Sequence, residues 1–304
     1  MTPSEIGGLI AMQGFAGLSL FSVLLLMALG LAIIFGQMGV INMAHGEFMT
    51  IGAYTIYVFT TVAATSFPAI APYSFLIAII GAFCIAFAAG YLTEFLLIQH
   101  LYRRPLDTLL ATWGLSLGMQ QMFRSSFGAK EVSPVIPEWL LGSFKPTASI
   151  DIPINGLFVM GLTVLVTATV FLMLFKSRWG LRVRATVANR MMSNAAGINT
   201  KKVDRLTFAI GCGIAGVAGA AFTTIGSTGP TSGSLYIVDA FLTVTFGGAA
   251  SLLGTIASAF GIAQTQSISE FFMTGSMAKV LTLLVVVTIL MLRPQGLFAS
   301  KVRR

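Results

Sequence analysis

Charged side chains are scarce in this sequence. Only 9% of its 304 residues are Asp, Glu, Lys or Arg, whereas soluble proteins carry about 25%. The mean hydropathy is +0.89, and a chain with so few polar residues lacks the side chains to cover a water-facing surface. The sequence therefore indicates an integral membrane protein, with a single transmembrane domain over residues 1–304 and no substantial soluble domain.

Cysteine and histidine are almost absent. The chain has two cysteines, Cys84 and Cys212, both in apolar runs, and two histidines, His45 and His100. A structural zinc site needs four ligands at characteristic spacings, so we expect no metal site, no disulfide and no cofactor bound by this chain. The acidic residues are scattered, and no Ser/His/Asp or Cys/His set is visible. We therefore expect no catalytic residues and no enzyme.

A nucleotide-binding loop is also missing. The pattern G-x-x-x-x-G-K-[ST], which cradles the phosphates of ATP, does not occur. If ATP drives this protein, the ATPase must be another polypeptide. The run Gly211-Cys-Gly213-Ile-Ala-Gly216 matches a dinucleotide fingerprint, but it lies inside an apolar segment with no strand before it. Glycines at this spacing let membrane helices approach closely, and we interpret the run as a packing motif.

Long uncharged runs are what the sequence has in abundance. A helix needs about 20 apolar residues to cross a bilayer, and the runs predict helices near 14–36, 44–64, 74–99, 108–124, 154–175, 206–226 and 278–292. The stretch 235–268 is interrupted by glycines, so it would cross twice as two short segments or enter and return. We expect an all-α, polytopic helical bundle of about eight transmembrane helices with broken or re-entrant segments.

Basic residues flank the apolar runs. The net charge of +8 is of the kind seen in proteins that bind nucleic acid, but this placement follows the positive-inside rule of membrane proteins. The loops 100–107 and 176–205 and the C-terminus would face the cytoplasm. The N-terminus and the proline-rich loop 128–153 would lie outside. The expected surroundings are a lipid bilayer, with no nucleic acid.

Two acidic positions lie within long apolar stretches. Asn42, His45 and Glu47 form the most polar cluster of the first 90 residues, and an ionisable residue at membrane depth indicates function by default. The cluster either lines a passage or holds a broken helix, or it caps a helix at the cytoplasmic interface. Asp239 follows a glycine-rich break much as Glu47 does. This is either a trace of an internal repeat or an acid that complements a helix dipole.

The loop 176–205 has a design of its own. Residues 184–196 are good helix formers without proline, and Gly197 then ends the predicted helix. Met191 and Met192 would share one face with Ala195. That face would lie on the membrane or enter a groove on a partner protein, while the simpler alternative is an ordinary positive-inside loop. At the cytoplasmic end of the third helix, Glu94 would pair with Arg103 or Arg104.

Four motifs, in order along the chain, resemble those of permease subunits in branched-chain amino acid-type ABC importers. They are GLAIIFGQMGVINMAHGEFMTIGAY (30–54), RWGLRVRATVANRMMSNAAGINTKKV (178–203), YIVDAFLTVTFGGAASLLGT (236–255) and LRPQGLF (292–298). Within that family, RPLDTLLATWGLSL (104–117) and FGAKEVSPVIPEWLLGS (127–143) look closer to the urea or short-chain amide branch.

This resemblance implies a subunit of the bacterial inner membrane that pairs with a second, homologous permease subunit. Two cytoplasmic ATPase subunits, which would use the ATP, would dock below, and a periplasmic solute-binding protein would deliver the solute. The segment 184–202 would couple ATP binding to a change of access in the cavity. Its coupling residues would be Arg184, Asn189, Arg190, Ala195, Ala196 and Gly197.

The expected function is the translocation path for urea or short-chain amides. A neutral solute needs hydrogen-bonding groups rather than a counter-charge, so the candidate pathway residues are polar ones in apolar runs: Asn42, Glu47, Thr50, Asp239, Thr243 and Thr245. The first alternative is a branched-chain amino acid permease, which a matched pair of charges for a zwitterion would favour. The second is a stand-alone channel or ion-coupled secondary transporter, which would transport without partners.

Overall fold

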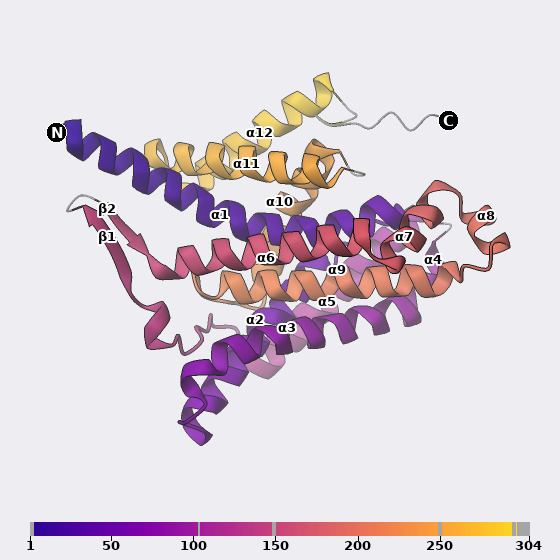
Figure 1. The fold of residues 1–304 in the computed structure, drawn as a ribbon, viewed down its shortest axis with the longest axis horizontal. Helices are drawn as coiled ribbons and strands as arrows, with labels where there is room; N and C mark the ends of the chain where they lie inside the picture. Colours follow the sequence, from indigo (N-terminus) through magenta and orange to yellow (C-terminus); the bar gives the residue numbers. More distant parts are fainter. Residues whose placement is uncertain (1–2, 103, 148–149, 249–250, 294–295, 297–304) are drawn as a thin grey trace.

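The computed structural model describes residues 3–102, 104–147, 150–248, 251–293 and 296. Most of its helices run along one long axis and form a bundle (Figure 1). The long helices are α1 (Pro3–Met38), α2 (His45–Ser66), α3 (Ala71–Thr93), α5 (Pro105–Phe127), α6 (Ile154–Lys176), α9 (Thr200–Phe222), α10 (Ser232–Gly247), α11 (Leu252–Phe272) and α12 (Gly275–Leu292). The short elements are a π-helical turn (Glu94–Ile98) and α4 (Gln99–Leu101), which continue α3, a 3-10 turn (Glu138–Leu140), β1 (Ser143–Thr147), β2 (Ile150–Pro153), α7 (Arg178–Ala188) and α8 (Arg190–Ala195).

Six of the described helices are long and apolar enough to cross a membrane: α1, α2, α3 with its continuation, α6, α9 and α12. Helices α5 and α11, with 23 and 21 residues, are as long but more polar and do not qualify as spans. The expected number was about eight. Helix α10 has only 16 residues. The predicted polytopic helical bundle with broken segments is confirmed.

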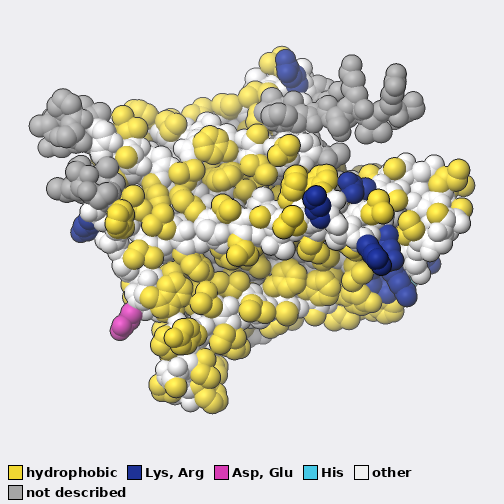
Figure 2. Space-filling model, viewed as in Figure 1, with side chains coloured by type: hydrophobic (Ala, Val, Ile, Leu, Met, Phe, Trp, Pro, Cys, Tyr) yellow, Lys and Arg dark blue, Asp and Glu magenta, His cyan; other side chains and the backbone are white. Residues whose placement is uncertain are grey.

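The two ends of the bundle differ in character. Helix α1 starts at the end that carries the hairpin β1–β2, and α7 and α8 lie at the opposite end (Figure 1). Most of the Lys and Arg side chains visible in Figure 2 gather at the α7–α8 end. The hairpin, in which Phe144 pairs with Ile152, lies in the loop 128–153. It is a small exception to the all-α prediction, because two short strands in a loop leave no long apolar pattern in the sequence.

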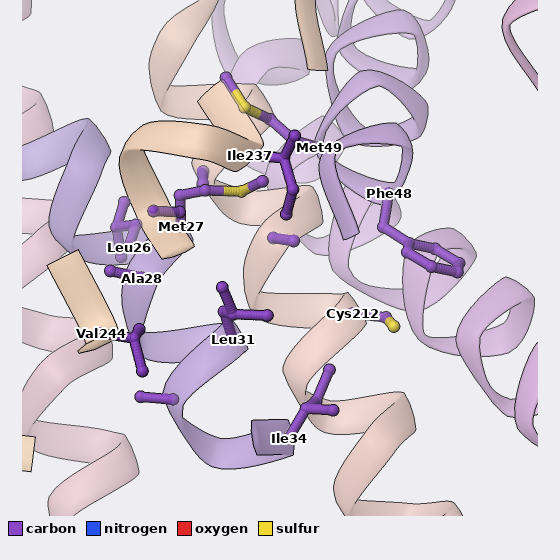
Figure 3. Packing of buried hydrophobic residues seen from close by; sticks show 14 of the residues in the cluster. Leu26, Met27, Ala28, Leu31, Ile34, Phe48, Met49, Cys212, Ile237 and Val244 are labelled. Atoms are coloured by element: carbon purple, nitrogen blue, oxygen red, sulfur yellow. The ribbon is translucent and has the colours of Figure 1, made fainter. Parts of the chain in front are cut away.

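The main apolar core is made by α1, α2, α9 and α10. Figure 3 shows Met27 of α1, Met49 of α2 and Ile237 of α10 meeting inside the bundle. Glycines let the backbones come close, since a Cβ on Gly211 of α9 would lie 2.7 Å from the carbonyl oxygen of Gly30, and one on Gly216 would lie 2.6 Å from that of Ala82. The packing interpretation of the glycine motif in α9 is confirmed.

Candidate functional site

Helix α2 begins inside the bundle. After α1 ends at Met38, Gly39 adopts a φ of +63°, and the chain turns back along α1. The His45 ring Nε2 then lies 3.3 Å from the carbonyl oxygen of Met27, which is eleven residues, or about 16 Å, before the end of α1. This position beside the middle of α1 favours the interpretation of the cluster as part of the bundle interior over a cap at the cytoplasmic interface. Sequence alone could not show how far the chain folds back.

Helix α10 begins at the same place. A Cβ built on Gly46 of α2 would lie 2.2 Å from the carbonyl oxygen of Gly233 in α10, and one on Gly233 would lie 2.1 Å from that of Gly46. The Gly233 N–H also donates to Thr50 Oγ1 at 3.1 Å. The two helix N-termini thus touch through glycine backbones, in what we call the Gly46–Gly233 contact.

The two helices leave this contact toward opposite ends of the bundle. Thr60 of α2 borders a cavity with Trp139, in the loop that carries the hairpin. Leu252, shortly after α10, borders a cavity with Arg184 of α7. Two broken helices that start at a common central point and diverge are the geometry of inverted repeats in transporters. The residue correspondence expected between Glu47 and Asp239 is nevertheless wrong, because Glu47 follows Gly46 directly and Asp239 lies six residues beyond Gly233.

Three of the candidate pathway residues gather at this contact. Asn42, Glu47 and Thr50 are each no more than 1% exposed. Glu47 Oε1 accepts hydrogen bonds from Ser116 Oγ at 2.9 Å and Gln120 Nε2 at 2.8 Å, both on α5. Glu47 Oε2 and Asn42 Nδ2 have no partner among the described residues. The cluster therefore holds polar groups deep in the bundle with part of their hydrogen-bonding capacity unused.

The other three candidates lie further along α10. Asp239 forms an ion pair with Lys279 of α12 at 3.1 Å. It is not in the first turn of α10, so its charge does not complement the helix dipole as the alternative proposed. The hydroxyls of Thr243 and Thr245 donate to carbonyl oxygens of their own helix. These residues are not brought to the Gly46–Gly233 contact.

A cavity of about 710 Å³ lies beside Lys279. Glu270 of α11 also borders it, and its Oε1 accepts a hydrogen bond from Gln266 Nε2 at 2.9 Å. Its apolar wall includes Phe15 of α1 and Phe222 of α9, and strand β2 borders it on the hairpin side. Asp151 of β2 borders the cavity too and pairs with Lys145 at 3.5 Å. Among the described residues, the cavity therefore presents one cation and two carboxylates beside an apolar wall, a combination that the sequence does not reveal.

Ser116, Gln120 and Lys279 are absent from the residues predicted from sequence. Ser116 and Gln120 are polar residues four positions apart, which places them on one face of a helix, and this signal was available. Lys279 starts a long apolar run, but nothing in the sequence connects it with Asp239.

The coupling segment is two helices rather than one. The predicted helix over 184–196 is interrupted at Asn189, whose backbone is extended (φ −160°). Its side-chain Oδ1 accepts from the Met192 N–H at 3.0 Å and so caps α8. The helix does end at Gly197, as predicted, with a φ of +81°. The interruption arises because asparagine is a strong N-cap residue and competes with continuation of α7.

An ion pair connects α8 to α9. Arg190 forms an ion pair with Asp204, which is fully buried, and its guanidinium lies over the Tyr102 ring at 5.4 Å. The Tyr102 hydroxyl, just beyond the α3 span, donates to Glu94 Oε1 at 2.7 Å. Burial and the bond to Glu94 raise the pKa of Tyr102 well above its usual value, so the phenol keeps its proton and remains a donor.

Glu94 is held by a residue far away in sequence. Arg205 Nε donates to Glu94 Oε2 at 2.8 Å, so the prediction of Arg104 as its partner is wrong, and Arg103 lies outside the described residues. Arg104 instead faces Asp107 at 3.5 Å. Glu94 begins the π-helical turn, a feature often found at functional sites. The two ion pairs, joined through Tyr102, connect α8 and α9 to the end of α3.

The tip of this segment is exposed. Met191 and Met192 have 83% and 69% of their surface accessible, and Ala195 and Ala196 are also exposed. Arg184 lies away from the tip, with its guanidinium 5.4 Å from the Phe175 ring centre. An exposed apolar tip on a firmly anchored helix is suited to contact another protein.

A family model described as "Branched-chain amino acid transport system / permease component" matches residues 14–290. The chain belongs to this permease family. It is 28% identical over 295 residues to the high-affinity branched-chain amino acid transport system permease protein LivH of Salmonella typhimurium, covering 94% of each chain. BraD of Pseudomonas aeruginosa, with a matching description, is 28% identical over 92% of this chain and 93% of its own. A probable branched-chain amino acid permease, LivH of Methanocaldococcus jannaschii, is 24% identical over 91% and 88%. No solved structure matches the chain.

The permease family accounts for the transmembrane bundle, and the match covers the first three of the four motifs. The relatives named above are transport permeases rather than enzymes. Their names favour branched-chain amino acids, the first alternative above, and give no support to the urea or short-chain amide branch. In this permease, the deep polar cluster, the charged cavity and the coupling segment are three separate parts of one bundle.

Proposed function

We propose that this chain is the membrane-spanning subunit of an ATP-driven importer for branched-chain amino acids. The observation that carries the substrate class is the cavity beside Lys279. Its volume of about 710 Å³ is in the range of small-molecule sites. Its lining combines opposite charges with an apolar wall.

A branched-chain amino acid matches this lining group by group. Its carboxylate would pair with the Lys279 ammonium, its amino group with the Glu270 carboxylate, and its side chain would contact Phe15 and Phe222, all of which border the cavity. Asp239, 3.1 Å from Lys279, would neutralise the lysine when the solute is absent. Urea carries no charge, so it would form no ion pair with Lys279 or Glu270.

The route inward would pass the Gly46–Gly233 contact. The two half-helix N-termini meet there, and Asn42, Glu47 and Thr50 supply polar groups around them. In this structure the backbones touch, so the contact would represent the closed position of the path. The pathway roles of Asn42, Glu47, Thr50, Asp239, Thr243 and Thr245 remain a proposal.

The exposed α8 tip would receive the ATPase. Met191 and Met192 would enter a groove on one of the two cytoplasmic ATPase subunits, the other being contacted by the second permease subunit. The Arg190–Asp204 pair would pass the movement to α9. A second, homologous permease subunit would complete the path, and a periplasmic solute-binding protein would dock at the hairpin end. In this proposal the N-terminus would lie outside and the C-terminus in the cytoplasm of a bacterial inner membrane, and the basic α7–α8 end supports this orientation.

Uptake of radiolabelled leucine by cells that carry the whole transporter tests the proposal. Lys279→Met should raise the KM for leucine about 30-fold, because removing one partner of a partly buried charge pair costs about 2 kcal/mol. Arg104→Met, in the exposed pair with Asp107, is the matched control and should change KM less than threefold.

Three results would overturn this function. Urea that competes with leucine would point back to the amide branch, and an unchanged KM in Lys279→Met would remove the cavity from the path. Leucine uptake by the purified chain alone in liposomes would indicate a channel or an ion-coupled transporter instead.

A further inference from the structure

A furrow runs between α1 and α6 on the outside of the bundle. Its deeper part is a cavity of about 690 Å³. It extends along α6 from Met160 to Leu172, which is about 18 Å at 1.5 Å per residue. Thr163 at its floor is buried, whereas Val164 beside it is 70% exposed. The length is close to the thickness of one hydrocarbon leaflet, about 15 Å.

Few polar atoms face this part of the furrow. The Ser22 hydroxyl donates to the carbonyl oxygen of Leu18 in its own helix, and the Thr163 hydroxyl to that of Val159 in α6. Thr167 of α6 also borders it, but its Oγ1 is buried and has no hydrogen-bond partner among the described residues. The surface that remains for an occupant is hydrocarbon. A solute with hydrogen-bonding groups would gain nothing here, whereas an acyl chain would bury its methylene groups.

The furrow continues into a second cavity at the basic end of the bundle. This cavity measures about 460 Å³ and is bordered by Gln37 of α1, Phe175 of α6 and Arg184 of α7. The two cavities adjoin along α6, where the rings of Phe171, in the first, and Phe175, in the second, are 4.4 Å apart. The second cavity therefore lies next to the first along α6, on its polar side.

Two side chains at this end have unused capacity for an anion or for hydrogen bonding. Arg184 takes part in none of the ion pairs among the described residues. Both amide atoms of Gln37 are buried and have no hydrogen-bond partner in the described part of the chain. A buried amide left without partners is costly. Gln37 would therefore gain by turning its amide into the cavity that it borders, toward an occupant that offers hydrogen-bonding oxygens and hydroxyls.

We propose that the α1–α6 furrow binds one phospholipid with an anionic head group. The phosphate contacts Arg184, the glycerol part of the head group contacts Gln37, and one acyl chain fills the apolar cavity. Basic pockets at the cytoplasmic side of transmembrane helices recognise lipid head groups in this way. A soluble ATPase subunit cannot reach the apolar part, because that part lies along the membrane-spanning portion of α6. The proposal does not depend on which solute the permease carries.

Native mass spectrometry of the full-length chain, purified from membranes that contain phosphatidylglycerol, tests this assignment. We expect one phosphatidylglycerol per chain to survive detergent washing, and phosphatidylcholine offered in its place to be retained at least about fivefold less. Arg184→Gln should lower phosphatidylglycerol retention by about the same factor. Arg182→Gln, on the same helix but outside the furrow, is the matched control and should retain the lipid as the parent chain does.

The acyl-chain part is tested by Ala168→Trp, whose indole would occupy the apolar cavity. We expect it to abolish retention of the lipid while the chain still inserts into the membrane and binds detergent normally. Equal losses in Arg184→Gln and Arg182→Gln would reduce the effect to general surface charge and overturn the site. Full retention of the lipid in Ala168→Trp would also overturn the site, as would displacement of the lipid by millimolar inorganic phosphate alone. A lipid that is bound by the isolated chain but absent from the assembled transporter would overturn it too, because a second permease subunit would then cover the furrow.

Discussion

Replacing Gly46 by alanine is the most direct probe of the central contact. The added Cβ would lie 2.2 Å from the carbonyl oxygen of Gly233, whereas ordinary contacts begin near 3.4 Å. Helices α2 and α10 would have to separate by about 1.2 Å. That shift would break the bond from the Gly233 N–H to Thr50 Oγ1, now 3.1 Å long. Because the obstacle is backbone, no side chain can rotate away to make room.

The expected cost follows from these two effects. Overpacking of this kind costs roughly 1–3 kcal/mol, and loss of a buried hydrogen bond adds roughly 1 kcal/mol. We therefore expect Gly46→Ala to lower the free energy of unfolding by about 2–4 kcal/mol, or the Tm by roughly 5–15 °C on the scale of soluble domains. Thermal unfolding of the purified chain in detergent measures this, and leucine uptake should fall with it.

Gly261→Ala is the matched control. Gly261 lies within α11, and a Cβ there would meet nothing within 4 Å, so this variant should be as stable as the parent chain or slightly more so. If Gly46→Ala and Gly261→Ala melt together and transport equally, the tight approach of α2 to α10 is refuted, and with it the closed position of the path.

Two further predictions concern the cytoplasmic end. Gly197→Trp should uncouple ATP hydrolysis from leucine uptake, because the φ of +81° costs other residues roughly 1–2 kcal/mol. Gly197→Asn should keep the coupling, because asparagine tolerates this conformation. An equal ratio of ATP hydrolysed to leucine imported in both variants would argue against the role of Gly197. Glu94→Gln should destabilise the chain by about 3 kcal/mol, because it leaves the Arg205 guanidinium, 18% exposed, without its counter-charge. Asp107→Asn, in an exposed pair, should cost less than about 1 kcal/mol, and equal melting of these two variants would show that the buried pair contributes nothing.

The positions of the long helices could be predicted from sequence because the signal is local. Each span needs an apolar run of fixed length, and the predicted range 154–175 coincides almost residue for residue with α6. The end of α8 at Gly197 is equally local, since glycine accepts a left-handed backbone without a Cβ clash. The gathering of Asn42, Glu47 and Thr50 was also within reach, because they lie within nine residues of one another.

The errors concern depth and long-range pairing. Nothing in residues 39–44 tells how far the chain folds back before α2 starts, so the cluster at His45 could not be placed relative to Met27. The pair of Glu94 with Arg205 joins residues 111 positions apart. The prediction chose Arg103 and Arg104 because they are close to Glu94 in the sequence. The break at Asn189 had a local signal, the N-cap preference of asparagine, but the surrounding helix formers outweighed it.

Because α2 and α10 diverge from one point, they can tilt together around it like the two arms of one lever. With 22 and 16 residues, the arms are about 33 and 24 Å long. A joint rigid tilt of about 10° around the Gly46–Gly233 pivot would carry their far tips by about 6 and 4 Å, and in opposite senses at the two membrane faces. One small rotation at this contact between two glycine backbones would thus narrow one mouth of the bundle while it widens the other, without breaking a hydrogen bond inside either helix.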